Sequence, residues 1–324
     1  MQRWRGLEAV PTGWGRSVVT VGVFDGVHLG HQQLISCAVD RGHERGLPTV
    51  LVTFDPHPAE LIRPGSHPAH LTSLRRRADL VAELGVDAFC VLPFTAELSR
   101  QEPAEFAHEV LVERLHAADV VVGRNFTFGH RAAGDVALLT TLGQRFGFGV
   151  QGLSLISGDM IAGDQVTFSS TYIRACIDAG DVTAAAAALG RPHRVEGVVV
   201  HGDHRGRELG FPTANIATAP YTALPADGVY AGRFAIDTAD GRSTGAAGRR
   251  LLMTAISVGT NPTFSGRERN VEAYVLDADE NFYGFDVAVD FEHRLRGQER
   301  YDDVGALITQ MNKDVARTRE LLGS

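Results

Sequence analysis

The sequence predicts a first domain built around a parallel β-sheet with flanking helices, and a second domain built as an antiparallel β-barrel with a closing helix. Three observations predict this fold. Strand signals alternate with helical lengths in the first half, short strand signals follow one another between turn residues in the second half, and the 324-residue length suits about two domains. We expect the domains to cover residues 1–188 and 189–324, because the pattern changes around Arg191 and Pro192.

The strands expected in the first half are apolar or β-branched runs that end in turns. They cover residues 18–24, 49–54, 87–94 and 119–123. After the first run, Leu34 and Ala38 fall on one helical face, and Gly42 and Gly46 are expected to end that helix. Pro103 suits the first turn of a later helix. Strands separated by helical lengths predict βαβ units and hence a parallel sheet.

The strands expected in the second half are short and separated by Gly, Pro, Asn and Asp residues. They cover residues 195–200, 229–236, 252–258, 271–276 and 286–291. This spacing is typical of an antiparallel barrel. Val304, Ile308, Met311 and Val315 then fall on one face of a closing helix, and residues 241–250 are the most loop-like stretch.

The composition is that of an ordinary globular protein. With 31 basic and 39 acidic side chains the formal net charge is −8, which argues against nucleic acid or a membrane surface as a partner. Cys37, Cys90 and Cys176 are well separated and form no CxxC pair, so neither a disulfide framework nor a zinc knuckle is expected. No apolar stretch reaches the roughly 18 residues of a membrane span, and the first residues lack a secretory signal, so we expect a cytoplasmic protein.

The chain has a single lysine, Lys313, close to its C-terminus. P-loop NTPases and protein kinases both need a lysine on the nucleotide phosphates. The sequence therefore excludes both of these mechanisms. The sequence does not predict the oligomeric state.

A glycine-rich turn joins the first expected strand to the first expected helix. Its sequence, GVFDGVHLGH, covers residues 22–31. Glycines let the backbone approach a phosphate, and a helix N-terminus at the carboxyl end of a parallel strand attracts anions. His28 and His31 stand three residues apart and can both donate hydrogen bonds to an α-phosphate as its charge builds up. A plain turn with two exposed histidines is the alternative, but the strand before it and the helix after it favour a functional site.

A second polar segment, SSTYIR at residues 169–174, begins another expected helix. Ser170 and Thr171 can cap this helix and bond phosphate oxygens, with Arg174 one turn further along. An ordinary helix cap would explain the hydroxyls alone. Together, the two segments resemble the HxGH and SSTxIR motifs of the nucleotidyltransferase superfamily, which has a Rossmann-like fold. The resemblance implies nucleotidyl transfer, with His28, His31 and Arg174 as catalytic groups. It implies an ATP site formed by Gly22, Phe24, Asp25, Gly26, His28, His31, Ser170, Thr171 and Arg174.

Two further segments narrow the resemblance. TFDPHP at residues 53–58 and VVGRNFTFG at residues 121–129 look like parts of the FMN adenylyltransferase module of bacterial FAD synthetases. The resemblance implies that the flavin is placed by Phe54, Pro56, His57 and Asn125. Many members of that family carry Asp at the position of Asn125, so we expect a hydrogen bond there rather than a charged contact. Core packing is expected for Phe126 and Phe128.

The most specific string of the chain is GDHRGRELGFPTAN at residues 202–215. Its glycines, Gly202, Gly206 and Gly210, predict a flap and do not match the GxGxxG dinucleotide fingerprint. Thr213 and Asn215 alternate along an extended segment, so both point to one face. Their hydroxyl and amide oxygens are hard ligands suited to Mg²⁺ shared with phosphates, although turn chemistry after a proline would explain them too.

This string resembles the GxxxGRxxGFPTAN motif of riboflavin kinases. The segments DGVY, VGTNPTF and NVEAY, which begin at residues 227, 258 and 270, resemble those that follow it in that family. The resemblance makes Glu272 the base that accepts the proton of the ribityl hydroxyl as it attacks the γ-phosphorus of ATP, where an exposed strand glutamate is the plain alternative. It implies Mg²⁺ on Thr213 and Asn215. It implies an ATP site formed by Gly202, Gly206, Gly210, Thr213, Asn215, Pro262 and Thr263.

These segments cover nearly the whole chain, in the order found in the bifunctional riboflavin kinase/FMN adenylyltransferase family. The resemblance implies that the barrel converts riboflavin and ATP into FMN, and that the first domain joins FMN and ATP into FAD with release of pyrophosphate. One alternative is a nucleotidyltransferase with another acceptor, such as a nicotinamide or phosphopantetheine nucleotide, which would have no use for the barrel. The other is a flavin-responsive regulator without catalysis, and the presence of His28, His31, Thr213 and Glu272 argues against it.

Overall fold

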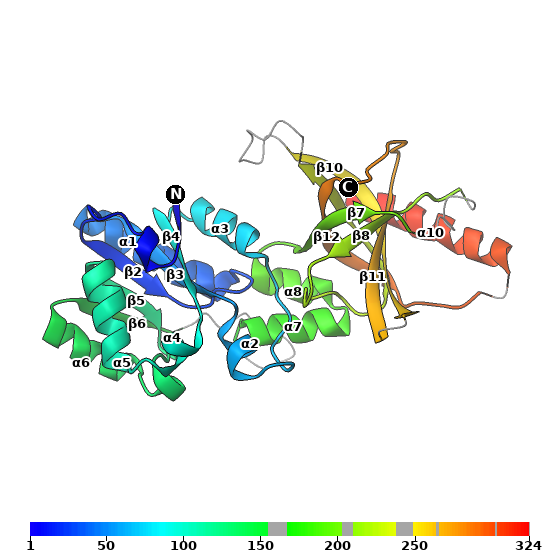
Figure 1. The fold of residues 1–324 in the computed structure, drawn as a ribbon. Helices are drawn as coiled ribbons and strands as arrows, with labels where there is room; N and C mark the ends of the chain where they lie inside the picture. The colour runs from blue at the N-terminus through cyan, green and yellow to red at the C-terminus, as the bar shows by residue number, and fades with distance from the viewer. Residues whose placement is uncertain (155–166, 203–209, 238–248, 264–265, 302, 324) are drawn as a thin grey trace. The chain divides into compact units, whose positions relative to one another are not determined.

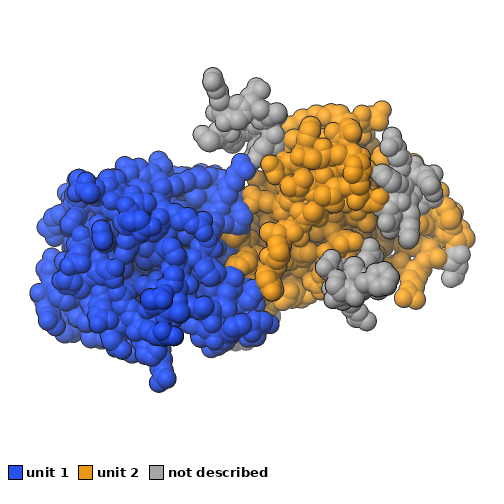
Figure 2. Space-filling model, in the orientation of Figure 1, with its two compact units in different colours: residues 1–68, 73–169 blue, residues 69–72, 170–324 orange. Residues whose placement is uncertain are grey.

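A computed structural model of the chain divides into two compact units (Figure 2). Unit 1 comprises residues 1–68 and 73–169, and unit 2 comprises residues 69–72 and 170–324. The structure describes the chain except residues 155–166, 203–209, 238–248, 264–265, 302 and 324, and except the side chains of residues 237, 249, 261–263 and 266–268. The functional boundary between residues 188 and 189 stays a prediction.

Unit 1 is built on a six-stranded parallel sheet with the strand order β1-β4-β3-β2-β5-β6 (Figure 1). Its strands are β1 (Gln2–Arg5), β2 (Ser17–Val21), β3 (Thr49–Asp55), β4 (Ala88–Pro93), β5 (Ala117–Gly123) and β6 (Gly149–Leu153). The predicted parallel sheet is confirmed, and the expected runs correspond to β2, β3, β4 and β5. The two edge strands, β1 and β6, were not predicted.

Helices cover both faces of this sheet, as in a doubly wound fold. They are α1 (Leu29–Arg45), α2 (Pro58–Ile62), α3 (Leu74–Glu83), α4 (Ala96–Arg100), α5 (Pro103–Phe106), the π-helical segment η2 (Ala107–Arg114) and α6 (Val136–Phe146), with short 3₁₀ turns η1 (Leu7–Ala9) and η3 (His130–Ala132). Neighbouring residues of β2 enter different cores: Val18 packs with residues of α1 and α3, and Val19 with residues of η2 and α6. The central strands are therefore buried on both sides.

Helix α1 does not end at Gly42, so that part of the prediction is wrong. The helix continues to Arg45, and Gly46 ends it in the left-handed conformation with φ 63°. Gly42 has another role, because a Cβ there would lie 2.5 Å from Thr49 Oγ1 and 2.8 Å from the carbonyl oxygen of Leu47. The missing side chain lets α1 pack closely against the start of β3.

The barrel of unit 2 is closed and antiparallel, with the strand order β10-β11-β8-β7-β12-β9. Its strands are β7 (His193–Val200), β8 (Ala214–Thr218), β9 (Gly228–Asp237), β10 (Arg249–Thr263), β11 (Gly266–Val275) and β12 (Asp286–Arg296). The predicted barrel is confirmed, and the extended segment expected around Asn215 is β8. Tyr230, Phe234 and Phe291 fill its interior and are fully buried.

Among the described residues, the helices that accompany the barrel are α7 (Ser170–Ala179), α8 (Val182–Leu189) and α10 (Val304–Leu322). The predicted closing helix is α10, which Asp303 caps by accepting a hydrogen bond from the backbone N–H of Ala306. Val315 of α10 packs with Phe211 and Leu276. The loop-like stretch 241–250 falls mostly outside the described residues. Over the part of the chain that the structure describes, no helix is long and apolar enough to cross a membrane.

Candidate active sites

The first candidate site lies at the carboxyl edge of the sheet in unit 1. The glycine-rich turn of residues 22–31 follows β2, Phe54 is the next-to-last residue of the neighbouring β3, and Asn125 follows β5 on the other side of β2. The chain runs from β2 toward β3 and β4, and later returns to the opposite side with β5. This reversal is a topological switch point, where open parallel sheets bind ligands. The sheet thus brings three of the predicted segments to one edge.

His28 and His31 form a stacked pair at the N-terminus of α1. Their ring centroids lie 3.6 Å apart with an interplanar angle of 23°. His28 is the N-cap residue, and its Nδ1 accepts a hydrogen bond from the backbone N–H of His31 at 3.3 Å. Because an accepting Nδ1 carries no proton, this bond selects the tautomer with the proton on Nε2. The pair therefore combines a hydrogen-bond donor with the positive end of a helix dipole, the arrangement that favours a phosphate.

The turn before this pair has an unusual backbone. Phe24 and Val27 adopt left-handed conformations with φ of 52° and 40°, and Gly26 has φ 85°. Such a conformation costs a non-glycine residue about 1–3 kcal/mol, so the surrounding contacts must hold it. The side chain of Gln32 donates to the carbonyl oxygen of Val27 at 2.9 Å, and the Phe24 ring packs edge-on against His31. Strain of this kind is found mainly where a protein holds groups for function.

Asp25 was predicted to bind ATP, and in the structure its side chain is 1% exposed. Its Oδ1 accepts a hydrogen bond from Arg77 of α3 at 3.2 Å. No motif or spacing in the sequence points to Arg77, because it is the last of three consecutive arginines on an otherwise ordinary helix.

The residues predicted to place the flavin are arranged along the same edge. Phe54 packs edge-on against Phe94, with ring centroids 5.7 Å apart, while Pro56 and Asn125 are exposed. His57 caps α2, since its Nδ1 accepts from the backbone N–H of Ala59 at 3.0 Å. Its own backbone N–H donates to the Glu60 side chain. The expected core packing of Phe126 and Phe128 is confirmed. Phe128 belongs to a hydrophobic core of unit 1, and Phe126 packs against it.

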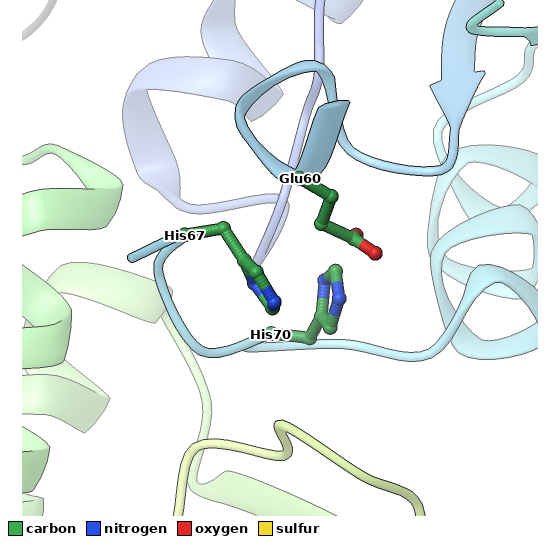
Figure 3. A group of neighbouring side chains, drawn as sticks. All are labelled: Glu60, His67 and His70. Carbon is green, nitrogen blue, oxygen red and sulfur yellow. The ribbon is translucent and has the colours of Figure 1, made fainter. Parts of the chain in front are cut away.

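Glu60, His67 and His70 are residue types that can ligate a metal (Figure 3). Glu60 and His67 belong to unit 1, whereas His70 belongs to unit 2. We therefore assign no metal site to these residues.

The predicted triphosphate segment begins α7 and belongs to unit 2. Ser170 is the first residue of the helix, and Thr171 is exposed in its first turn. The Nε of Arg174 donates to the carbonyl oxygen of Ala69 at 2.6 Å within the same unit. A joint action of these residues with His28 and His31 stays a prediction.

In the barrel, strand register brings the predicted kinase residues together. Asn215 on β8 lies directly opposite Glu272 on β11, and Ser257 on β10 is the neighbour of Glu272 on its other side. The hydroxyl of Thr213 donates to Oε2 of Glu272 at 3.2 Å. A hydroxyl, an amide and a half-buried carboxylate thus meet within one small area of the barrel wall.

These residues divide between two cavities of ligand size. Thr213 and Asn215 line a cavity of about 300 Å³ together with the chain after β11, from Ala278 to Tyr283. Glu272 lines a second cavity, of about 380 Å³. The hydrogen bond between Thr213 and Glu272 therefore connects the two. A phosphate donor in the first cavity and an alcohol in the second would have the carboxylate between them.

Sequence reasoning assigned a role only to Glu272 among the polar residues of the second cavity, and its other polar residues include Asp227, Thr260 and Gln298. Asp227 accepts a hydrogen bond from Thr260 Oγ1 at 2.7 Å, and both residues line the cavity. Gln298 also lines it and donates to the carbonyl oxygen of Val258 at 3.0 Å. The DGVY segment contains Asp227 and could have pointed to it, whereas Gln298 lies in a connection that carries no motif.

Part of the predicted nucleotide flap is described. A Cβ on Gly202 would collide with the side chain of Asn215, and Gly210 has φ 84°, so both positions suit glycine. Gly206 lies outside the described residues. Pro262 and Thr263 belong to the end of β10, and the structure does not describe their side chains.

Comparison with known proteins agrees with this division into two sites. A family model described as FAD synthetase matches residues 11–171, and one described as riboflavin kinase matches residues 189–322. The bifunctional riboflavin kinase/FMN adenylyltransferase of Escherichia coli (strain K12) is 32% identical over 306 residues, which cover 94% of this chain and 93% of that protein. The chain belongs to the bifunctional riboflavin kinase/FMN adenylyltransferase family.

Other members of the riboflavin kinase/FMN adenylyltransferase family match over similar lengths. The Pseudomonas fluorescens protein is 35% identical over 323 residues, covering 99% of this chain and 98% of its own. A crystal structure from Streptococcus pneumoniae, described as a macrolide-efflux protein, superposes with a TM-score of 0.85 and 29% identity over 98% of this chain and 99% of that one. The family resemblance inferred from the motifs is thus confirmed, as is the order of the two parts.

Proposed function

We propose that this chain performs two consecutive ATP-dependent transfers, each in its own site. The barrel phosphorylates riboflavin to FMN, and the parallel-sheet domain transfers an adenylyl group to FMN, which gives FAD and pyrophosphate. The observation that carries the proposal is the Thr213–Glu272 hydrogen bond, which lies between two cavities. The same chain holds a stacked histidine pair at a helix N-terminus that suits a phosphate.

In the kinase step, Glu272 acts as the general base. Its carboxylate accepts the proton of the terminal ribityl hydroxyl as that oxygen bonds to the γ-phosphorus of ATP, and the bond to the ADP oxygen breaks. The Thr213 hydroxyl holds Oε2 of Glu272 in place through its 3.2 Å hydrogen bond. Riboflavin occupies the cavity that contains Glu272, and the phosphates of ATP occupy the cavity that contains Thr213.

Thr213 and Asn215 fit a magnesium ion, because their oxygens are hard ligands and both line the proposed phosphate cavity. When bound, the ion would offset the negative charge of the phosphates. A nearby carboxylate such as Glu272 adds to the preference of this area for a cation.

In the adenylyl transfer, the FMN phosphate attacks the α-phosphorus of ATP, and the bond to pyrophosphate breaks. The attacking oxygen is already an anion, so no general base is required. His28 donates from Nε2 to the α-phosphate as charge builds up there, and His31 assists at the same helix N-terminus. Arg174, Ser170 and Thr171 hold the remaining phosphates of ATP in this proposal.

The two functional domains are proposed to follow residues 1–188 and 189–324, which is supported by the start of the riboflavin kinase match at residue 189. Because both reactions consume ATP, we propose the cytoplasm as their location.

The test is an incubation of the purified chain with riboflavin, ATP and Mg²⁺, with flavins separated by chromatography over time. FMN should appear first and FAD should follow, and FMN supplied with ATP should give FAD directly. A chain that converts neither riboflavin nor FMN would refute the proposed function.

A further inference from the structure

A deeply buried arginine lies directly behind the turn that carries the histidine pair. Arg77 of α3 is only 3% exposed, and Asp25 of the turn is 1% exposed. Arginine is rarely buried to this degree, because its charge loses hydration that only well-matched partners replace. The partners of Arg77 therefore indicate what the residue holds.

The side-chain hydrogen bonds that the structure describes for Arg77 reach the turn and the strand beside it. One terminal nitrogen donates to the carbonyl oxygen of Val23 at 2.9 Å and to Thr53 Oγ1 at 3.3 Å. The other terminal nitrogen donates to Asp25 Oδ1 at 3.2 Å. The Thr53 hydroxyl in turn donates to the same Val23 carbonyl at 2.9 Å. Arg77 and Thr53 thus fix one backbone oxygen together.

These contacts hold the turn on both sides of its first strained residue. Val23 and Asp25 flank Phe24, which has φ 52° and whose ring centroid lies 5.2 Å from that of His31. A backbone in this conformation does not persist unless its surroundings impose it. The planar guanidinium does so with donors in a fixed fork, which a flexible or apolar side chain does not offer.

Stability alone is a weak reason for such an arrangement. A buried ion pair contributes little net stability, and well-packed apolar residues of similar volume often replace it without loss. The geometry that Arg77 imposes is what an apolar residue would not reproduce.

We propose that Arg77 is a positioning residue for the adenylyl transfer. It touches no reacting atom; it fixes the backbone around Phe24 and thereby orients the imidazoles of His28 and His31 toward the α-phosphate. The inference rests on the proposed function of the histidine pair and extends it to a residue on another helix.

The test uses the full chain and the variants Arg77→Met and Arg77→Lys. FAD formation is measured from FMN and ATP, FMN formation from riboflavin and ATP, and folding by thermal unfolding. We expect Arg77→Met to lower kcat for FAD formation by about 10²-fold, with KM for FMN changed less than about threefold, because a small misplacement of catalytic groups has effects of this size. Riboflavin phosphorylation should be unchanged. Arg77→Lys keeps the charge beside Asp25 and should recover part of kcat.

Arg75 provides the matched control, because it is exposed on the same helix. Arg75→Met should leave both activities unchanged. A folded Arg77→Met chain with wild-type kcat for FAD formation would overturn the inference, as would a loss that appears only in KM or that Arg77→Lys does not improve.

If Arg77→Met does not fold, Thr53→Val decides the question. This change keeps the shape of the side chain and removes the hydroxyl that bonds both Arg77 and Val23. We expect kcat for FAD formation to fall by about three- to tenfold with riboflavin phosphorylation intact, and an unchanged kcat would overturn the inference. A wild-type chain that makes no FAD from FMN and ATP would instead contradict the proposed function itself.

Discussion

At the scale of single residues, Glu272 shows how strand register brings polar groups together. Its neighbours on β11, Val271 and Ala273, are buried in the barrel, while Glu272 itself is half-buried and meets Asn215 across the ladder. The position of Thr213 just before β8 then brings a hydroxyl to the carboxylate. A glutamate alternating with apolar residues would otherwise be an ordinary solvent-facing strand residue.

The change Glu272→Gln tests the proposed role of Glu272 as the general base, with little change in shape. The amide oxygen still accepts the hydrogen bond from Thr213, but it does not accept a proton from riboflavin. We expect kcat for FMN formation to fall by about 10²-fold or more, with FAD formation from FMN unaffected. Asp286→Asn removes a carboxylate from an exposed strand position and should change neither rate. Equal kcat values for Glu272→Gln and the wild type would exclude Glu272 as the base.

Burial of Cys90 makes the stability of unit 1 depend on pH in the alkaline range. Burial in the sheet, with a smaller effect of Glu8, raises the pKa of the Cys90 thiol from 9.0 to about 12. Between these values the native thiol keeps a proton that the unfolded thiol loses, so the free energy of unfolding decreases as pH rises through this window. We expect the free energy of unfolding, measured with urea at about pH 8 and about pH 11, to decrease less between these pH values for Cys90→Ala than for the wild type. Equal losses would contradict the burial effect.

At the scale of elements, close packing between α1 and β3 places the turn of residues 22–31 on a rigid support. Gly42 permits this packing, so Gly42→Ala should destabilise the chain. The added Cβ meets a backbone oxygen of Leu47, at a cost of about 1–3 kcal/mol, whereas the gain in helix propensity is about 1 kcal/mol. A net loss of about 1 kcal/mol should appear as a lower Tm.

Gly13→Ala is the control, because a Cβ at that position would meet no atom within 4 Å. It should leave Tm unchanged. If Gly42→Ala were as stable as Gly13→Ala, the helix and strand would not be in tight contact.

The central elements could be predicted from the sequence, and the edges could not. The strands β2, β3 and β5 are continuous apolar runs because they are buried on both faces. Edge strands lack this signal: β1 buries only Trp4, and β6 has no fully buried residue. Gly42 was misread as a helix end because its reason, the contact with β3, is a tertiary one that local patterns do not contain.

At the scale of the whole molecule, the predicted site residues fall into sets that the fold joins in different ways. His28, His31 and Gly22 are close in sequence, so a local motif contains them. Thr213 and Glu272 are 59 residues apart, and only the barrel register joins them. Family resemblance assigned both residues to the kinase site beforehand, but it did not predict their contact.

Positioning residues such as Arg77 could not be predicted in this way. Arg77 is 52 residues from Asp25, and nothing in its own segment distinguishes it from Arg75 and Arg76. Its burial and its partners become visible only in the folded sheet.

The most direct measurement compares the variants His28→Asn and Glu272→Gln, each incubated with riboflavin, ATP and Mg²⁺, with FMN and FAD separated by chromatography. Two independent sites predict that His28→Asn stops at FMN, that Glu272→Gln leaves riboflavin unchanged but converts added FMN to FAD, and that an equimolar mixture of the two makes FAD from riboflavin. If either variant, still folded, lost both activities, or if the mixture made no FAD, the assignment of two separate transfers to two separate sites would be contradicted.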